Sequence, residues 1–218
     1  MINKNDFIEI EFTGKIKGTD EIFDTNIKED MPTTDNRQPT TETKPFILSV
    51  GHKMLPVGFD DDLIGKETGK SYEVTLKPEV AFGKRNPQMI RMIPTKHFHE
   101  QKIEPVRGMQ LALDGQLVKI LSSDKGRTLV DFNNPLAGKE VTYTYKINKI
   151  VTDQKEKVNA LQDFLFRKQF EFDVDDKTLI FKVEKQFEPY IKLFAPKFEE
   201  ILGLKVESKL TESKNNNH

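Results

Sequence analysis

Residues 44–83 constrain the fold of this chain more than any other stretch. They hold an alternating apolar run at 46–50, an amphipathic segment at 58–64 and a second alternating run at 71–76. This order predicts a strand, a short helix and another strand, followed by a loop that carries Phe82. A sheet that packs on one short helix is therefore the expected core of this part of the chain.

Bulky apolar residues crowd the start of this predicted helix, at Leu55, Pro56 and Phe59. Packing alone would accept smaller side chains at the entrance of a two-turn helix. The surplus of apolar groups therefore indicates a pocket beside the helix, in addition to a core beneath it.

Charge and composition exclude several classes of function. The chain has 34 Lys and Arg against 35 Asp and Glu, so no basic excess favours nucleic acid or an anionic membrane as a partner. Cysteine is absent, which excludes disulfides, thiolate catalysis and Cys-based zinc sites. The N-terminus has no apolar signal core, and no apolar run approaches the length of a membrane span. The simplest interpretation is a soluble cytoplasmic protein.

Two strands are expected ahead of the central stretch. Residues 7–12 alternate apolar and acidic side chains, and residues 22–24 end a second short strand. Gly14 and Gly18 are expected to bracket the turn between them. The polar residues 25–43 show no sustained period and predict a surface loop.

A small β module is expected between residues 86 and 133. Alternating runs at 109–113, 116–121 and 128–132 are separated by glycine-containing turns, which is a strong hairpin signal. The alternation then resumes as a long strand at 141–151. The module is therefore interpreted as an inserted small β domain, residues 86–133, within a discontinuous first domain formed by residues 1–85 and 134–151.

The remainder predicts a C-terminal α+β domain at residues 152–210, followed by a disordered tail at 211–218. Asp153 and Glu156 have the spacing of a capping box at the start of a helix. Runs at 170–174 and 177–183 predict a hairpin, and 204–210 a last strand. A helical apolar stripe at 190–202 lies between them, and Pro196 is expected to kink or split that helix.

The order of short motifs in residues 1–151 resembles the peptidyl-prolyl cis-trans isomerases of the FK506-binding type (FKBP). The likeness is to the long archaeal form, which is related to the bacterial SlyD proteins. The matching segments are Phe12-Thr13-Gly14, Phe23-Asp24, Lys44-Pro45-Phe46, Val50-Gly51, Gly58-Phe59, Ala81-Phe82-Gly83 and Asn134-Pro135-Leu136-Ala137-Gly138-Lys139. The resemblance implies an α+β fold in which an antiparallel sheet wraps a short helix, interrupted by a chaperone domain inserted in the flap.

The resemblance also implies the site. The catalytic residues it indicates are Asp24, Phe46, Phe59, Phe82 and Tyr143, and the substrate-binding residues are Phe12, Phe23, Leu55, Pro56 and Leu136. Asp24 would be the single charge at the floor of an apolar pocket. Most relatives carry, in place of Pro56, an Ile whose N–H binds the ligand carbonyl, and many have Tyr in place of Phe82.

The implied function is isomerisation of Xaa-Pro bonds in folding proteins, without a cofactor or metal, together with chaperone action. The expected partners are unfolded or partly folded polypeptides that contain proline, and a second copy of the chain bound through the C-terminal domain. Two other interpretations stay open: a catalytically weak chaperone or scaffold, and a nucleic-acid-binding barrel, which the charge balance disfavours.

Other polar residues have simpler structural interpretations. His97 and His99 could bind a metal, but two histidines in a polar loop are usually solvated. The run Asp60-Asp61-Asp62 is most simply a favourable anionic first turn of the helix.

Overall fold

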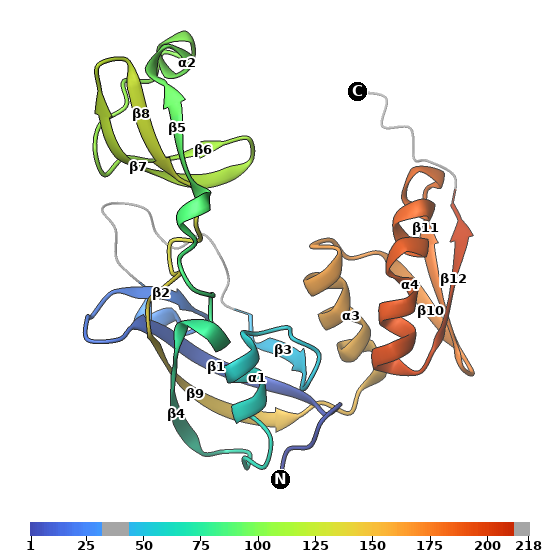
Figure 1. The fold of residues 1–218 in the computed structure, drawn as a ribbon. Coiled ribbons are helices and arrows are strands. Elements are labelled where there is room, and N and C mark those ends of the chain that lie inside the picture. Colours follow the sequence, from blue (N-terminus) through green and yellow to red (C-terminus); the bar gives the residue numbers. More distant parts are fainter. Residues whose placement is uncertain (32–43, 212–218) are drawn as a thin grey trace. The chain divides into compact units, whose positions relative to one another are not determined.

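The computed structural model describes residues 1–31 and 44–211 (Figure 1). Most of the predicted loop at 25–43, from residue 32 onward, and the predicted tail from residue 212 lie outside the described residues. The chain divides into two compact units. The first unit comprises Met1–Thr13, Asp24–Val74 and Tyr143–His218, and the second comprises Gly14–Phe23 and Thr75–Thr142. The division into three domains expected from the sequence stays a prediction.

A five-stranded sheet contributes strands to both units. Its order is β2-β1-β9-β4, with β3 paired to β1. The strands are β1 Phe7–Ile16, β2 Ile22–Thr25, β3 Phe46–Ser49, β4 Ser71–Leu76 and β9 Val141–Ile150. The prediction that β1 ends at residue 12 is wrong. The strand continues through Gly14, which is buried and therefore belongs to the sheet instead of a turn.

The helix α1, Val57–Asp62, packs against this sheet in the first unit, as the sequence predicts. Alternate residues of β1 such as Ile8 and Ile10 are fully buried, and so is Phe59 of the helix. A strand that buries such apolar side chains against a helix gives an α+β layer.

The second unit contains an antiparallel sheet of order β5-β8-β7-β6. Its strands are β5 Ile90–Pro94, β6 Gln110–Leu113, β7 Gln116–Asp124 and β8 Arg127–Asp131. The hairpin prediction is confirmed, because Asp114 and Gly115 both have positive φ, at 50° and 76°, as a two-residue turn of type I′ requires. The core beneath the sheet consists of Phe98, Val118, Ile120 and Val130.

The helix α2, Thr95–Glu100, was not predicted. The sequence analysis placed His97 and His99 in a loop, whereas both lie on this helix. Phe98 supplies the reason, because its buried ring anchors a short helix whose other residues are mostly polar.

The C-terminal part of the first unit is a three-stranded sheet with two helices. The strands, in the order β10-β11-β12, are β10 Glu171–Asp175, β11 Thr178–Val183 and β12 Lys205–Leu210, and the helices are α3 Gln154–Leu165 and α4 Glu188–Leu202. The strands β10 and β11 form the predicted antiparallel hairpin, whereas β11 and β12 run parallel, with α4 as the crossover between them (Figure 1).

Two local predictions in this part have different outcomes. The capping box is confirmed, since the N–H of Glu156 donates to Asp153 Oδ1 at 2.9 Å. The prediction that Pro196 splits the helix is wrong, because α4 runs unbroken through it. Burial of Ile191 and Phe198 on either side of the proline stabilises the helix by more than the one hydrogen bond that the proline removes.

Short 3₁₀ helices occupy Lys28–Asp30, Pro78–Val80, Pro87–Met89 and Lys185–Phe187. Within residues 1–31 and 44–211, no helix combines the length and the apolar character that crossing a membrane requires.

Candidate functional site

The turn between β3 and α1 is held by one buried carboxylate. Asp60 is 3% exposed, and its two oxygens accept hydrogen bonds from the N–H groups of Gly51 and Lys53, both at 2.9 Å. Sequence reasoning assigned Asp60 only to the helix dipole. The local sequence around Asp60 does not indicate its hydrogen bonds to Gly51 and Lys53, because these residues lie nine and seven positions earlier in the chain and outside the helix.

Four aromatic rings meet at α1 and form what we call the α1 cluster: Phe12, Phe46, Phe59 and Tyr143. The ring of Phe12 makes edge contacts with the other three, with centroids 6.0 to 6.1 Å apart. The rings of Phe59 and Tyr143 are tilted at 4.5 Å. The first unit thus brings together four of the aromatic residues that the sequence analysis assigned to a site.

The members of the α1 cluster differ in exposure. Phe59 and Tyr143 are at most 1% exposed and Phe12 is 5% exposed, so these three form a base. Phe46 is only half-buried and reaches the surface, as do Leu55 and Pro56 before the helix. The cluster therefore combines a closed base with an open apolar rim.

Asp24 of β2 interacts electrostatically with Tyr143 of this cluster. Burial raises the pKa of the Asp24 carboxyl, and a hydrogen bond from the backbone of Thr25 partly offsets this rise. The pKa of the Tyr143 hydroxyl is raised mainly by burial and, to a smaller extent, by the charge of Asp24. The accessible surface of Asp24 nevertheless leaves it exposed. Because a carboxylate in contact with water is screened, the raised pKa of Asp24 implies little for stability.

The helix α1 begins at a proline. Pro56 occupies the N-cap position with φ −50° and ψ 140°, and its carbonyl accepts from the N–H groups of Phe59 and Asp60 at 2.9 and 3.0 Å. Val57, the first helical residue, has no carbonyl one turn back to bond with and is 43% exposed. The first backbone donor at this rim is therefore the N–H of Val57.

The second unit holds the other predicted site residues. The rings of Phe23 and Phe82 meet edge to face with centroids 5.6 Å apart. Phe23 and Leu136 line a hollow of about 620 Å³, together with Leu117 and Leu121 of β7. The ten predicted residues are thus divided between the units.

A polar network that the sequence analysis missed joins the two chain segments leading into the β5–β8 sheet. Arg85 donates from Nε and Nη2 to one oxygen of Asp131, at 3.0 and 2.6 Å. Asn133 donates to the other oxygen at 2.6 Å and also bonds the N–H and carbonyl of Asn86. Burial alone would raise the pKa of Asp131, but these hydrogen bonds outweigh it and lower the pKa. The network fixes where the strands of this sheet enter and leave.

The histidines on α2 bind acidic neighbours. His97 Nδ1 lies 3.4 Å from Glu100, and His99 Nε2 lies 3.1 Å from Glu104. These groups are exposed on the helix surface. In the part of the chain that the structure describes, no group of three or more His, Asp or Glu side chains is arranged to hold a metal ion.

The sequence of this chain is similar to two protein-family models and to several characterised proteins. Residues 1–104 match the family model described as FKBP-type peptidyl-prolyl cis-trans isomerase, and residues 91–136 match a model described as FKBP26, IF domain. The chain is 31% identical over 156 residues to the short-type peptidyl-prolyl cis-trans isomerase of Methanocaldococcus jannaschii. The aligned residues make up 72% of this chain and 98% of that protein.

Two bacterial relatives are similar over about half of the chain. The isomerase SlyD of Pasteurella multocida is 33% identical over 108 residues, 48% of this chain and 54% of that protein. The 16 kDa FKBP-type isomerase of Escherichia coli strain K12 is 28% identical over 111 residues, 49% of this chain and 74% of that protein.

Proposed function

This chain belongs to the FKBP-type peptidyl-prolyl cis-trans isomerases, enzymes that interconvert the cis and trans forms of Xaa-Pro bonds, and we propose that it does so at the open rim of the α1 cluster. Its substrates are polypeptides that contain proline. The observation that carries the proposal is the cluster itself, in which Phe46 reaches the surface above a base of buried rings.

The chemistry needs no nucleophile. Rotation about the peptide bond faces a barrier of about 18–20 kcal/mol because the amide must lose its resonance. The twisted amide carries less charge separation than the planar one, so a dry apolar surface favours it over the ground state. Each 1.36 kcal/mol or so removed from the barrier raises the rate about tenfold.

The half-exposed residues are proposed to touch the proline ring. Phe46, Leu55 and Pro56 form the wall in the first unit, and Phe59, Tyr143 and Phe12 support them from below. This division follows from exposure, since a side chain that is fully buried holds its neighbours in position and does not meet substrate. Phe23, Phe82 and Leu136 lie in the second unit, where they are proposed to contact substrate within that unit.

Asp24 is proposed to orient the substrate amide by its charge. It is exposed, and its charge contributes to the raised pKa of Tyr143, which supports this role. General-base chemistry is not required, because isomerisation moves no proton. Pro56 lacks the donor that many relatives have, so we assign the hydrogen bond to the substrate carbonyl to the N–H of Val57.

A cis-trans interconversion assay on a short Xaa-Pro peptide tests these assignments. Asp24→Ala should lower kcat/KM about tenfold or more while the protein stays folded. The exposed Asp173 of β10 provides a matched control, and Asp173→Ala should leave the rate unchanged. Equal rates for the wild type and Asp24→Ala would remove Asp24 from the site.

The β5–β8 sheet is proposed to be an inserted domain that holds unfolded chains. Met92 and Leu117 are 60% and 51% exposed, and the edge strands β5 and β6 each pair on one side only, so the sheet offers apolar surface and free backbone groups. Because both units belong to one chain, a client held on this sheet is tethered to the isomerase site, which raises the effective concentration of its prolines.

Deletion of residues 90–131 tests this division of labour. Ile90 pairs directly with Asp131, so a short Gly-Ser link can join the flanking segments. We expect turnover of short proline peptides to stay within about twofold, and acceleration of the proline-limited refolding of a whole protein to fall strongly. Equal losses on both substrates would contradict the proposal.

Self-association through the C-terminal part is a further proposal. Leu193 of α4 is 70% exposed and Tyr190 37% exposed, one turn apart on the same helix face. Sedimentation equilibrium of the wild type and of Leu193→Asp tests it. A dimer that becomes a monomer in the variant supports the interface, and a wild type that is monomeric at all concentrations contradicts it.

A further inference from the structure

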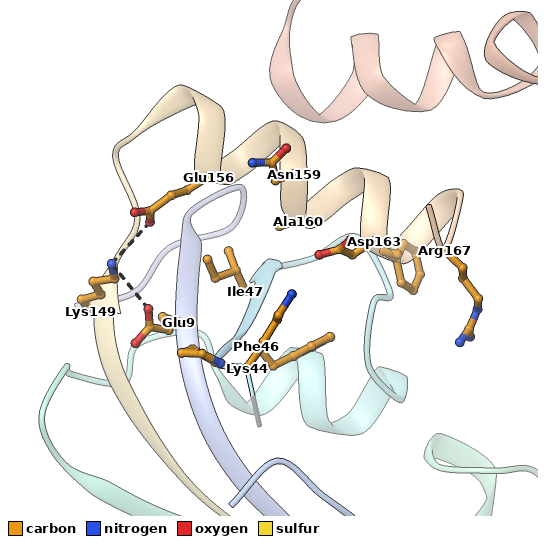
Figure 2. Close-up of a pocket in the computed structure, with 12 residues that line it drawn as sticks. Glu9, Lys44, Phe46, Ile47, Lys149, Glu156, Asn159, Ala160, Asp163 and Arg167 are labelled. Atoms are coloured by element: carbon orange, nitrogen blue, oxygen red, sulfur yellow. Dashed lines mark hydrogen bonds and ion pairs between the residues drawn. The ribbon is translucent and has the colours of Figure 1, made fainter. Parts of the chain in front are cut away.

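A hollow of about 420 Å³ lies between β3 and α3 in the first unit (Figure 2). It is lined by the consecutive residues 44–47 and by one side of α3. Side chains of successive strand residues point to opposite faces of a sheet. Phe46 and Ile47 of β3 both line the hollow although successive side chains alternate, so the hollow reaches the edge of the strand, and Lys44 and Pro45 line it just before the strand begins.

That edge of β3 is free among the described residues. In the sheet, β3 pairs only with β1, with Ile8 opposite Leu48 and Glu9 opposite Ile47. An open strand edge presents unpaired N–H and C=O groups to an incoming chain.

The backbone N–H and C=O groups of Ile47 point away from β1. The N–H of Val50 donates to the carbonyl of Asp6 at 2.9 Å, which makes these two residues a hydrogen-bonded pair. Bonded and non-bonded pairs alternate along antiparallel strands, so Leu48 and Phe46 bond β1 while Ile47 turns its N–H and C=O away from it. Ile47 can thus form two hydrogen bonds with an added strand.

The opposite wall of the hollow is a stripe along α3. Glu156, Ala160, Asp163 and Phe164 lie at helical spacings of three and four, and all four face the hollow. In Figure 2, the side chain of Ile47 points from β3 toward α3, below Ala160. An apolar side chain of an added strand could therefore pack between Ile47 and Ala160.

Among the described residues, some charged side chains along the hollow form ion pairs and others do not. Lys149 at one end bonds both Glu9 and Glu156, at 3.4 and 3.3 Å (Figure 2). Within the described residues, Lys44 and Arg167 form no ion pair, although both line the hollow. A partner that brings a carboxylate to Lys44 or Arg167 would complement this surface.

We infer that the free edge of β3 and the facing side of α3 bind an extended segment of an unfolded polypeptide, which adds to β3 as a strand. The segment pairs with the backbone of Ile47, places an apolar side chain beside Ala160 and brings an acidic side chain to Lys44. Phe46 lines this hollow and also belongs to the proposed proline-binding rim, where its ring meets that of Phe12, so the two sites adjoin along β3.

The position of this site gives it a role in handling clients. Phe46 and Ile47 are neighbours on one strand, so a chain held along Ile47 lies within a few residues of the isomerase rim. Tethering at that distance presents nearby prolines at high effective concentration.

A proline-free peptide probes the site without engaging the isomerase rim. The probe is an acetylated and amidated decapeptide of alternating Val and Thr with one Glu, labelled with fluorescein and titrated into the full chain. We expect hydrogen exchange of the Ile47 amide to slow when the peptide binds. Protection confined to residues 90–131, with the Ile47 amide unchanged, would overturn the inference.

Two variants separate backbone pairing from charge. Ala160→Phe fills the hollow and should weaken binding at least tenfold, as followed by fluorescence anisotropy. Lys44→Glu should weaken the Glu-containing peptide and favour the same peptide with Lys in place of Glu. The matched control is Lys155→Glu, on an exposed part of α3 outside the hollow, which should bind as the wild type does.

The charge exchange keeps the test decisive if Ala160→Phe does not fold. Unchanged affinity in Ala160→Phe, or a Lys44→Glu variant that shows the same preference between the two peptides as the wild type, would each overturn the inference.

Discussion

Two aromatic clusters in the first unit have similar compositions and different forms. The α1 cluster leaves Phe46 half-exposed. The second, which we call the Phe166 cluster, surrounds a ring that is 6% exposed, and five other rings lie with centroids 5.3 to 5.8 Å from it. Those five rings are Phe170, Phe181, Tyr190, Phe194 and Phe198.

The difference lies in the elements that cover each cluster. The helix α4 is 15 residues long and, together with α3 and β11, closes around Phe166. The helix α1 is 6 residues long, and Phe46 of β3 beside it stays half-exposed. Aromatic content therefore makes a core in both places, and only the α1 cluster opens to solvent.

The largest expected effect breaks the closed cluster. Phe166→Ala should lower the free energy of unfolding of the C-terminal part by about 3–5 kcal/mol, because it leaves a cavity among five rings. Hydrogen exchange of the β11 amides measures this part by itself. Phe172→Ala, at the margin of the same sheet, is the control and should cost less. A loss below about 1 kcal/mol in Phe166→Ala would mean that the cluster is not a core.

The next effect concerns the open cluster. Phe46→Ala should lower kcat/KM on a short proline peptide about 30-fold, equivalent to about 2 kcal/mol of transition-state stabilisation. Its cost in stability should be smaller than that of Phe166→Ala, since Phe46 is already half-exposed. Urea unfolding of the same sample provides the comparison. A variant that loses stability as Phe166→Ala does and keeps its activity would assign Phe46 to the core.

A smaller effect separates packing from hydrogen bonding beneath α1. The Tyr145 hydroxyl donates to Asp62 Oδ2 at 2.6 Å, and its ring lies 4.9 Å from that of Phe59. Tyr145→Phe keeps the ring and should cost about 1.5 kcal/mol, the lower end for a bond to a charged group, because Asp62 also pairs with Lys66.

Tyr145→Phe should also change how the free energy of unfolding depends on pH above pH 9. Burial, and then Asp62, raises the pKa of Tyr145 above its usual 10.0. The stabilisation from the protonated hydroxyl is therefore complete below pH 10 and is lost as the pH rises through the higher folded pKa. Unfolding curves between pH 9 and 11 should show a smaller loss of stability in Tyr145→Phe than in the wild type, and identical losses would contradict this assignment.

The smallest effect concerns a contact between α4 and the turn after β3. The side chain of His52 is 6% exposed, with Nε2 2.9 Å from Asn5 Oδ1 and Nδ1 3.6 Å from Glu200. Burial lowers the pKa of His52, and Glu200 opposes this only in part. The stabilisation from the neutral ring is therefore present above pH 6.5 and is lost as the pH falls below it.

His52→Gln should flatten this part of the pH profile of unfolding, measured between pH 5 and 8. A profile that still declines as steeply below pH 6.5 in the variant would show that another group is responsible.

Local chemistry made much of the fold predictable. The turn at Asp114 and Gly115 and the capping box at Asp153 were predicted correctly because each depends on residues within four positions along the chain. The helix α2 and the unbroken helix at Pro196 were missed for the opposite reason. Burial of Phe98 and of Phe198 outweighs local preference in both places.

The candidate site was predictable in part. Motif order indicated Phe12, Phe46 and Phe59, and these rings do meet. The network between Arg85 and Asp131 left no local trace, since its partners are 46 residues apart in the chain.

The sequence by itself determined most of the strands and the longer helices, the hairpin turns and the family, because these depend on periodicity, turn residues and short motifs. Only the tertiary structure decided which aromatic rings are closed over and which reach solvent, and that Asp60 holds a loop and Ile47 a free edge. Those outcomes depend on which distant segments cover a residue, and burial of that kind is a property of the assembled chain.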